Sequence, residues 1–266
     1  MRARASLIFF LVVVLFSVMY LTKRKTTPDL PLPITCAKLR AQLESQSCPD
    51  TVAFDWGELL HYREENSRLP PPAAGEPRAV FFGDSITLEW PVLSQPKPFA
   101  GLSAVNRGIS GQLTAQMLLR FRQDVIDLHP VVVVIQGGTN DLARILPPAL
   151  PSIESNLASM VQLAQANGIR TILAAIPPVN DYELDPQGQP YLQTHTHSPQ
   201  QIRELNDWLR KYAAETHCSF IDYYSAMVDN QGFLKKGFSA DGLHPNAVGY
   251  AAMEPLAAEA LKAAAH

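Results

Sequence analysis

The chain has 266 residues, of which 47% are apolar and 18% are charged, and its 22 Lys and Arg against 25 Asp and Glu give a formal net charge of −3. This apolar fraction is ordinary for a globular protein, and the length suffices for one sizeable core with a small appendage. These values exclude a disulfide-stabilised miniprotein, an intrinsically disordered chain and a membrane protein with many spans.

Charge is distributed unevenly along the chain. Residues 1–25 contain five basic residues and no acidic one. Residues 26–266 therefore carry the other 17 basic residues against all 25 acidic ones, a net charge of −8. Such an acidic body lacks the positive field that neutralises phosphates, so we expect no nucleic-acid partner.

The N-terminus contains an apolar run of eighteen uncharged residues, 5–22, bracketed by Arg4 and Lys23. As a helix this run would be about 27 Å long, close to the ~30 Å hydrocarbon core of a bilayer. The flanking bases disfavour a buried core helix. We expect residues 1–25 to form a membrane anchor; a cleaved signal peptide is the alternative, although no A-x-A-like cleavage site comes after the run. Both flanks carry similar positive charge, so the orientation stays open.

The cysteines bear on the cellular compartment. A disulfide between Cys36 and Cys48 would suit an oxidising compartment, and two free thiols are the alternative. Cys218 lies apart from them, in the apolar-flanked sequence HCSFID. We expect the body of the protein to lie outside the cytoplasm, membrane-anchored, or secreted if the N-terminal segment is cleaved.

Residues 26–77 form a region of their own between the apolar run and the main body of the chain. Pro28, Pro31 and Pro33 discourage helix and indicate a tether. Residues 35–69 suggest two short helices, the second around 56–69. The sequence PPPAAGEP, residues 70–77, separates this appendage from the body that begins at Arg78.

From Arg78 onward, the pattern alternates between strand and helix. We expect strands over 79–82, 104–106, 131–135, 171–175 and 219–221, and helices over 113–128, 153–166, 199–216 and 246–264. The run VVVVI at 131–135 is typical of a fully buried strand, and the apolar spacing in 113–128 is helical. Strands separated by helices predict parallel crossovers and a three-layer α/β/α sandwich around a central parallel sheet.

Polar motifs come directly after the predicted strands. They are Gly-Asp-Ser at 83–85, Asn-Arg-Gly at 106–108, Gly-Thr-Asn-Asp at 138–141 and, before the last helix, Asp-Gly-Leu-His-Pro at 241–245. Each motif alone is a weak signal, because a serine after a strand often caps a helix and the others could be ordinary turns. Ligands in such folds bind beyond the carboxyl ends of the strands, so all four together predict a functional site there.

In their fuller form these motifs read FFGDSIT, NRGISG, GGTND and DGLHP. They resemble the four blocks of the SGNH hydrolases of the GDSL esterase/lipase family, and the resemblance covers residues 78–266. It implies a flavodoxin-like sheet and an esterase that needs no metal or organic cofactor. It implies Ser85 as the nucleophile, Asp241 and His244 as the other members of a triad, and Ser85, Gly108 and Asn140 as donors to an oxyanion.

The chemistry of these residue types agrees with the resemblance. A serine hydroxyl becomes a nucleophile when a base such as His244 accepts its proton. Asp241, three residues earlier, could accept the Nδ1 proton and fix the tautomer of the imidazole. Backbone N–H groups of Ser85 and Gly108 and the Asn140 amide could stabilise the negative oxygen of a tetrahedral intermediate, and Gly108 would allow close approach of the substrate. No G-x-S-x-G elbow occurs, so the nucleophile turn differs from that of α/β-hydrolases.

Other polar and aromatic residues are interpreted structurally. We expect Asp84 and Asp141 to bond their own turns. His195 and His197 resemble a metal pair, but no Cys, Asp or Glu has matching ligand spacing, which favours a solvated loop. Trp208 should pack on its helix. Trp90 could line an acyl pocket or belong to the core.

The sequence is compatible with several classes of ester substrate. The family resemblance implies a small ester and includes carbohydrate O-acetyl esterases, lysophospholipases, thioesterases and arylesterases. The polar residues of 176–198, which we expect to form a long loop near the site, favour a compact substrate such as an acetylated sugar, whereas the anchor favours a lipid. We expect a short-chain or acetyl ester; a lysophospholipase, a thioesterase, an O-acyltransferase with the same triad and a non-catalytic glycan- or lipid-binding module are the alternatives.

Overall fold

The computed structural model describes residues 55–95, 98–144 and 149–265. The predicted anchor, the tether, the first appendage helix and the Cys36–Cys48 pair lie outside these residues. Among the helices that are described, none is both long and apolar enough to cross a membrane.

A parallel sheet forms the centre of the described structure. Its strands are β1 (Arg78–Gly83), β2 (Ser103–Gly108), β3 (Val132–Gln136), β4 (Arg170–Ala174) and β5 (Ser219–Ile221), in the order β2-β1-β3-β4-β5. All four neighbouring pairs are parallel, which confirms the predicted central parallel sheet. Gly83 at the end of β1 is in register with Gly108 on β2 and with Gln136 on β3, so the carboxyl ends of these three strands meet at one edge.

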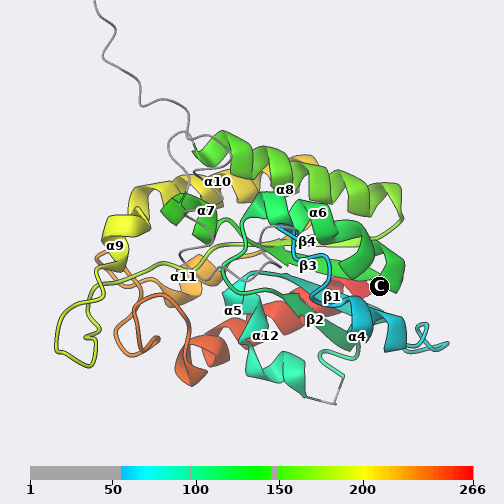
Figure 1. Cartoon of the computed structure of the whole chain (residues 1–266), viewed down its shortest axis with the longest axis horizontal. Coiled ribbons are helices and arrows are strands. Elements are labelled where there is room, and N and C mark those ends of the chain that lie inside the picture. Colours follow the sequence, from blue (N-terminus) through cyan, green and yellow to red (C-terminus); the bar gives the residue numbers. More distant parts are fainter. Residues whose placement is uncertain (1–54, 96–97, 145–148, 266) are drawn as a thin grey trace, which may run out of the picture. The chain divides into compact units, whose positions relative to one another are not determined.

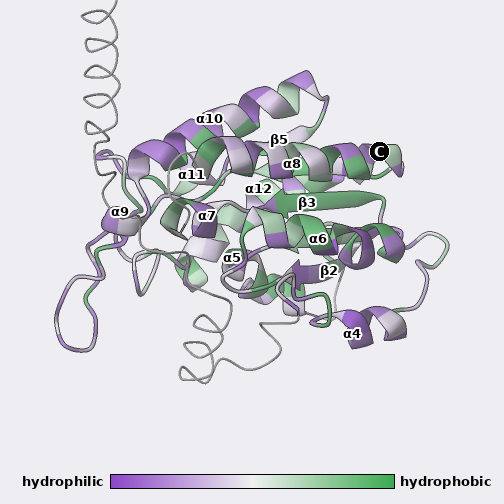
Figure 2. Cartoon of the chain, turned by 45° about the horizontal axis from the view of Figure 1, so that its top comes forward, coloured by the Kyte–Doolittle hydropathy of each residue, from purple (hydrophilic) through white to green (hydrophobic). Residues whose placement is uncertain are grey.

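Helices cover both faces of the sheet (Figure 1). Because side chains alternate along a strand, Val80 and Phe82 face one apolar cluster, with α6 (Thr114–Asp124), α8 (Ala149–Ala166) and α10 (Pro199–Glu215). Ala79 and Phe81 face the other, with α5 (Ser85–Leu88), α11 (Tyr223–Met227) and α12 (Ala247–Ala265). Figure 2 shows β3 as an apolar strand between helices whose outward surfaces are largely polar. The predicted three-layer sandwich is confirmed.

Several elements differ from the prediction in their bounds. The helix expected over 113–128 ends at Asp124, and a separate turn of 3₁₀ helix covers Ile126–Leu128. His129 comes next, in the left-handed region at φ 51°. Pro130 disfavours helical backbone in the residue before it, so the helical backbone ends at His129. β2 extends beyond the expected 104–106, since it pairs with β1 along its whole length.

The appendage is less helical than expected. Its described helix is α4 (Arg63–Arg68), whereas the residues before it form turns in which the Asp55 carboxylate accepts from the backbone N–H groups of Leu59 and Leu60, both at 2.8 Å. The short helices α7 (Thr139–Arg144), α9 (Gln193–Thr196) and α11 were also not predicted. Each has six residues or fewer, too few for a hydrophobic period to be recognised.

Candidate active site

The serine of the first motif lies where β1 passes into α5. Asp84 is the N-cap of this helix, and its Oδ1 accepts the backbone N–H of Ile86 at 3.0 Å. Ser85 is the first helical residue and is 6% exposed. The sequence therefore presents one hydroxyl at the edge of the sheet, on a turn fixed by the aspartate before it.

Ser85, His244 and Asp241 form a hydrogen-bonded series. The Ser85 Oγ lies 3.0 Å from His244 Nε2, across 159 residues of sequence. His244 Nδ1 lies 2.7 Å from Asp241 Oδ2. With the carboxylate at Nδ1, that nitrogen is the donor and Nε2 is left as the acceptor for the serine proton. The structure thus brings together three of the predicted site residues in the order that nucleophilic catalysis requires.

The loop that carries Asp241 and His244 is shaped by the other carboxylate oxygen. Asp241 Oδ1 accepts the backbone N–H of Leu243 at 2.9 Å, that of His244 at 2.8 Å and the Ser239 hydroxyl at 2.9 Å. Gly242 has φ +79°, and a Cβ there would lie 2.3 Å from the carbonyl oxygen of Asn180. Only glycine fits this position, so the DGLHP spacing is a requirement of the loop geometry.

The same contacts set the charges of the pair. The hydrogen bond that His244 donates to Asp241 raises the pKa of His244 above its usual value, against the opposing effect of partial burial. Burial alone would raise the pKa of Asp241, but the hydrogen bonds from His244 and from the backbone outweigh it and hold that pKa well below its usual range. Asp241 is therefore ionised across the neutral pH range and favours a proton on the imidazole.

Asn140, at the start of α7, lies beside the loop after β2. Its side-chain nitrogen donates to the carbonyl oxygen of Gln112 at 3.2 Å. A carboxamide nitrogen carries two protons, so this contact orients the amide and leaves a second donor. The proposed oxyanion role of Asn140 stays a prediction.

The close packing of α5 against β2 explains why position 108 is a glycine. A Cβ at Gly108 would lie 2.2 Å from the backbone nitrogen of Leu88, so α5 can approach β2 only where a side chain is missing. The Gly108 N–H donates to Asn106 Oδ1 at 2.9 Å. To serve as an oxyanion donor this N–H would have to leave Asn106, so the oxyanion role of Gly108 stays a prediction. The glycine itself is required by the close approach of the backbone of α5.

The two other acidic residues of the motifs are both buried. Burial raises the pKa of Asp84 to about 7, and its Oδ2 has no hydrogen-bond partner. Asp84 does bond its own turn, as expected. Asp141 bonds beyond its own turn, which was not expected. Its carboxylate accepts the backbone N–H of Thr114 at 2.9 Å and the Thr114 hydroxyl at 2.6 Å. It therefore ties α7 to the start of α6.

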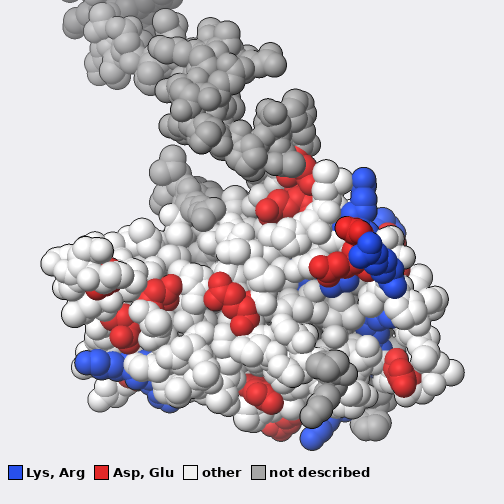
Figure 3. All heavy atoms as spheres, turned by 60° about the horizontal axis from the view of Figure 1, so that its bottom comes forward, with Lys and Arg blue, Asp and Glu red and all other residues white. Residues whose placement is uncertain are grey.

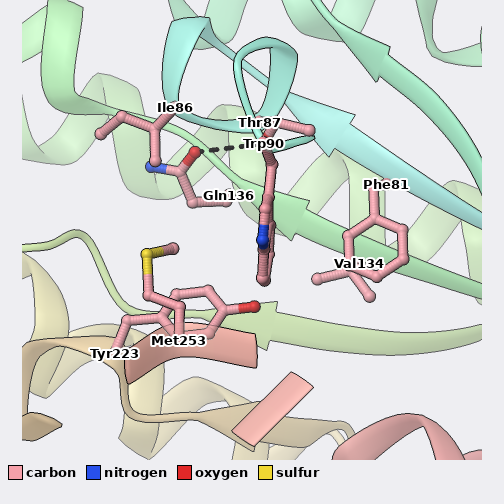
Figure 4. A pocket seen from close by; sticks show the side chains of 8 residues that line it. All are labelled: Phe81, Ile86, Thr87, Trp90, Val134, Gln136, Tyr223 and Met253. Carbon is pink, nitrogen blue, oxygen red and sulfur yellow. Dashed lines mark hydrogen bonds between the residues drawn. The ribbon is translucent and has the colours of Figure 1, made fainter. Parts of the chain in front are cut away.

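The aromatic residue near the nucleophile belongs to the core. Trp90 is 3% exposed and contacts the rings of Phe81, Phe99, Tyr223 and Tyr250. The cavity beside it has a volume of only about 10 Å³ (Figure 4), room for about one water molecule. An acyl chain does not fit there, so the alternative of an acyl pocket at Trp90 is not supported.

The remaining residues singled out in the sequence are His195, His197 and Trp208. His195 is exposed, whereas His197 is buried next to α9, which corrects the expectation of a fully solvated loop. No cluster of His, Cys, Asp and Glu able to hold a metal occurs within the described residues. Trp208 stacks on Tyr212 with ring centroids 4.8 Å apart, as a packing residue would.

Two residues of the stretch 176–198 support the triad loop and were not recognised in the sequence. The Asn180 N–H donates to the Gly242 carbonyl at 3.0 Å, and Gln193 Nε2 donates to the Asp241 carbonyl at 3.0 Å. The polar composition of this stretch was the available signal, and it placed the stretch near the site without identifying these two contacts.

The surface charge agrees with the acidic composition. On the face shown in Figure 3, acidic side chains are dispersed, and many of the basic ones of the described residues gather at the upper right edge, next to acidic ones.

An α/β sheet with a hydrogen-bonded serine, histidine and aspartate at its carboxyl edge is typical of hydrolases that use a serine nucleophile. Residues 81–252 match the GDSL-like Lipase/Acylhydrolase family. The chain belongs to this family, a class of ester hydrolases.

Individual relatives agree with this membership. A solved GDSL-like lipase from Bacteroides thetaiotaomicron VPI-5482 is 36% identical, with 78% of this chain and 98% of that one covered and a TM-score of 0.68. Esterase TesA of Pseudomonas aeruginosa PAO1 is 29% identical over 53% of this chain and 60% of its own length. Lipoprotein YqeF of Bacillus subtilis 168 is 33% identical over 38% of this chain and 48% of its own length. The chain thus matches less than two thirds of the length of TesA and of YqeF.

Proposed function

We propose that this protein is a serine esterase that hydrolyses a small carboxylic ester through Ser85, His244 and Asp241. The observation that carries the proposal is the series of two hydrogen bonds, 2.7 Å from Asp241 to His244 and 3.0 Å from His244 to Ser85. Family membership and the esterase among the relatives support the same reaction class.

In the proposed reaction, His244 Nε2 accepts the hydroxyl proton while Ser85 Oγ forms a bond to the acyl carbon. The carbonyl oxygen becomes an oxyanion, which the Asn140 amide and the backbone N–H groups of Ser85 and Gly108 stabilise, the last after it leaves Asn106 Oδ1. When the tetrahedral intermediate collapses, the imidazolium protonates the leaving alcohol and an acyl-enzyme remains. Water then attacks the acyl carbon with His244 again as base, which releases the carboxylic acid and restores the serine.

The direct test is hydrolysis of p-nitrophenyl acetate by purified variants. Ser85→Ala and His244→Ala should abolish turnover, whereas Ser159→Ala should leave it unchanged, because the Ser159 hydroxyl is exposed and bonds only its own helix. Full activity in Ser85→Ala would reject the mechanism. Release of free acid, measured alongside the alcohol, separates hydrolysis from acyl transfer to another acceptor.

We propose that the enzyme prefers esters with a short acyl chain. Trp90 lies in the aromatic core and does not line an acyl pocket, and the segment beside the triad loop, residues 176–198, is rich in polar residues. A series of acetyl, butyryl and octanoyl esters tests this. Decline of kcat/KM from acetyl to octanoyl is expected, and a preference for octanoyl would contradict the proposal.

We also propose that residues 1–25 attach the protein to a membrane, with residues 78–266 as the catalytic domain outside the cytoplasm and residues 26–77 between them. The bracketed apolar run supports this, and so does the lipoprotein among the relatives. Membrane fractionation of the full chain, together with determination of its first residue, distinguishes an anchor from a cleaved signal. Recovery of the intact chain in the soluble fraction would contradict the proposal.

A further inference from the structure

The described part of the appendage, residues 55–69, packs on the end of β2 and the loop that follows it, residues 107–112, which we call the loop 107–112. Its helix α4 contacts α6. The Arg107 guanidinium lies over the Tyr62 ring at 4.6 Å from its centroid, and Arg107 Nε donates to Asn66 Oδ1 at 2.9 Å. Residues 55–69 come before the residues that match the family, 81–252. They nevertheless contact the loop that borders the site.

Tyr62 holds the first part of this loop. Its buried hydroxyl donates to the carbonyl oxygen of Gly108, and burial raises the pKa of Tyr62, so the donor keeps its proton. That carbonyl shares a peptide unit with the N–H of Ile109, which donates to the carbonyl oxygen of Gly83 at 3.0 Å. Gly83 lies two residues before Ser85. One peptide unit is therefore held by the appendage at its oxygen and by the strand of the nucleophile at its nitrogen.

Glu58 holds the second part of the loop through Gln112. The Gln112 side-chain nitrogen donates to Glu58 Oε2 at 2.7 Å, and its side-chain oxygen accepts from Arg120 Nε at 2.6 Å. The side chain is thus fixed at both ends. The backbone oxygen of the same residue accepts from the Asn140 amide at 3.2 Å. A continuous path of hydrogen bonds leads from the appendage to the amide proposed to stabilise the oxyanion.

Arg120 joins the two paths below the loop. It is fully buried and donates to the carbonyl oxygens of Gly83 at 3.0 Å and of Arg107 at 2.9 Å. A buried guanidinium that donates to fixed acceptors restrains the backbone of those residues. The appendage adds two further bonds to the same segment, from Tyr62 to the Gly108 carbonyl and from Gln112 to Glu58.

We propose that residues 55–69 are a positioning element for the oxyanion side of the active site, in which Tyr62 and Glu58 hold the loop 107–112 and thereby orient the Asn140 amide. This inference rests on the proposed esterase function. Neither residue touches the reacting atoms. Their effect is on the preorganisation of the donors, and a preorganised donor contributes to the transition state more than to substrate binding.

The test compares Tyr62→Phe and Glu58→Asn with Gln123→Ala. Tyr62→Phe keeps the ring under Arg107 and removes one donor. Asn at position 58 is too short to bond Gln112 in the same way but tolerates the left-handed backbone there, φ 54°. The control Gln123→Ala removes a bond of the same kind, from Gln123 Nε2 to the Leu59 carbonyl, without contact to residues 107–112.

We expect both test variants to lower kcat for p-nitrophenyl acetate about three- to tenfold, the effect of one hydrogen bond, with KM changed less than twofold. Phosphonylation of Ser85 by a fluorophosphonate, which also places a developing negative oxygen at the site, should slow by a similar factor. Gln123→Ala should keep the wild-type kcat whatever its Tm. The conclusion is overturned if folded Tyr62→Phe and Glu58→Asn match the control in kcat and differ only in Tm. An inactive wild type would instead reject the esterase function.

Discussion

The bond between Asp241 and His244 provides the sharpest quantitative prediction. In Asp241→Asn the side-chain oxygen still accepts the backbone N–H groups of Leu243 and His244, so the loop keeps its shape. The amide nitrogen then occupies the place of Oδ2, 2.7 Å from His244 Nδ1, and donates to it. The imidazole proton must move to Nε2, and the ring can no longer accept the proton of Ser85.

The size of the effect distinguishes two causes. Loss of an orienting, charge-assisted hydrogen bond alone would lower kcat by roughly 10- to 150-fold, whereas the wrong tautomer costs about 10⁴-fold in serine hydrolases built on this pairing. We expect a loss of about 10³- to 10⁴-fold in kcat for p-nitrophenyl acetate. Ser239→Ala, which removes one donor to the other carboxylate oxygen, is the control and should lose less than tenfold. Retention of a tenth of wild-type kcat by Asp241→Asn would refute the reasoning.

Three further predictions concern pH and single side chains. Catalysis needs neutral His244, and Asp241 raises its pKa, so the acid limb of kcat/KM should have its midpoint above the usual histidine value of about 6.5; a midpoint below that value would contradict the assignment. The pKa of Asp84 is raised to about 7 by burial, with His244 and Asp141 as the charged groups that act on it, so the folded state keeps a proton that the unfolded state loses. The contribution of Asp84 to stability should therefore be fully present below the unfolded pKa of about 4 and be lost as pH rises through the folded pKa of about 7, and Asp84→Asn should raise Tm at pH 8 relative to wild type; a lower Tm at pH 8 with no change at pH 5 would count against it. Asn140→Ala should lower kcat by about 10²- to 10³-fold with little change in KM, and a loss under fivefold would remove Asn140 from the oxyanion site.

The parts of the fold with a strong periodic signal were predictable. The run of β-branched residues in β3 and the wide apolar face of α10 are set by burial, which leaves a pattern in the sequence. The end of α6 at Asp124 and the short helices α7, α9 and α11 were not, because they depend on tertiary contacts. Asp141 illustrates the latter, since its partner Thr114 lies 27 residues away.

The site was predictable to the same extent. The motifs predicted that Ser85, Asp241 and His244 lie close together, because parallel strands end at one edge of the sheet. The 2.7 and 3.0 Å contacts between their side chains became known only from the structure. For Gly108 the sequence indicated that a side chain must be absent, but the reason, the approach of α5 at Leu88, is a contact between distant segments. The contributions of Tyr62, Glu58 and Gln193 have no motif, because single polar side chains in turns carry no periodic signal.

The most direct measurement of the proposed chemistry is mass spectrometry of the intact chain after reaction with a fluorophosphonate. One adduct per chain, located on the peptide that contains Ser85 and absent from His244→Ala over the same time, is the expected result, because only a serine hydroxyl activated by a base reacts at this rate. An unlabelled wild type, or an adduct on any other residue, would contradict a nucleophilic Ser85.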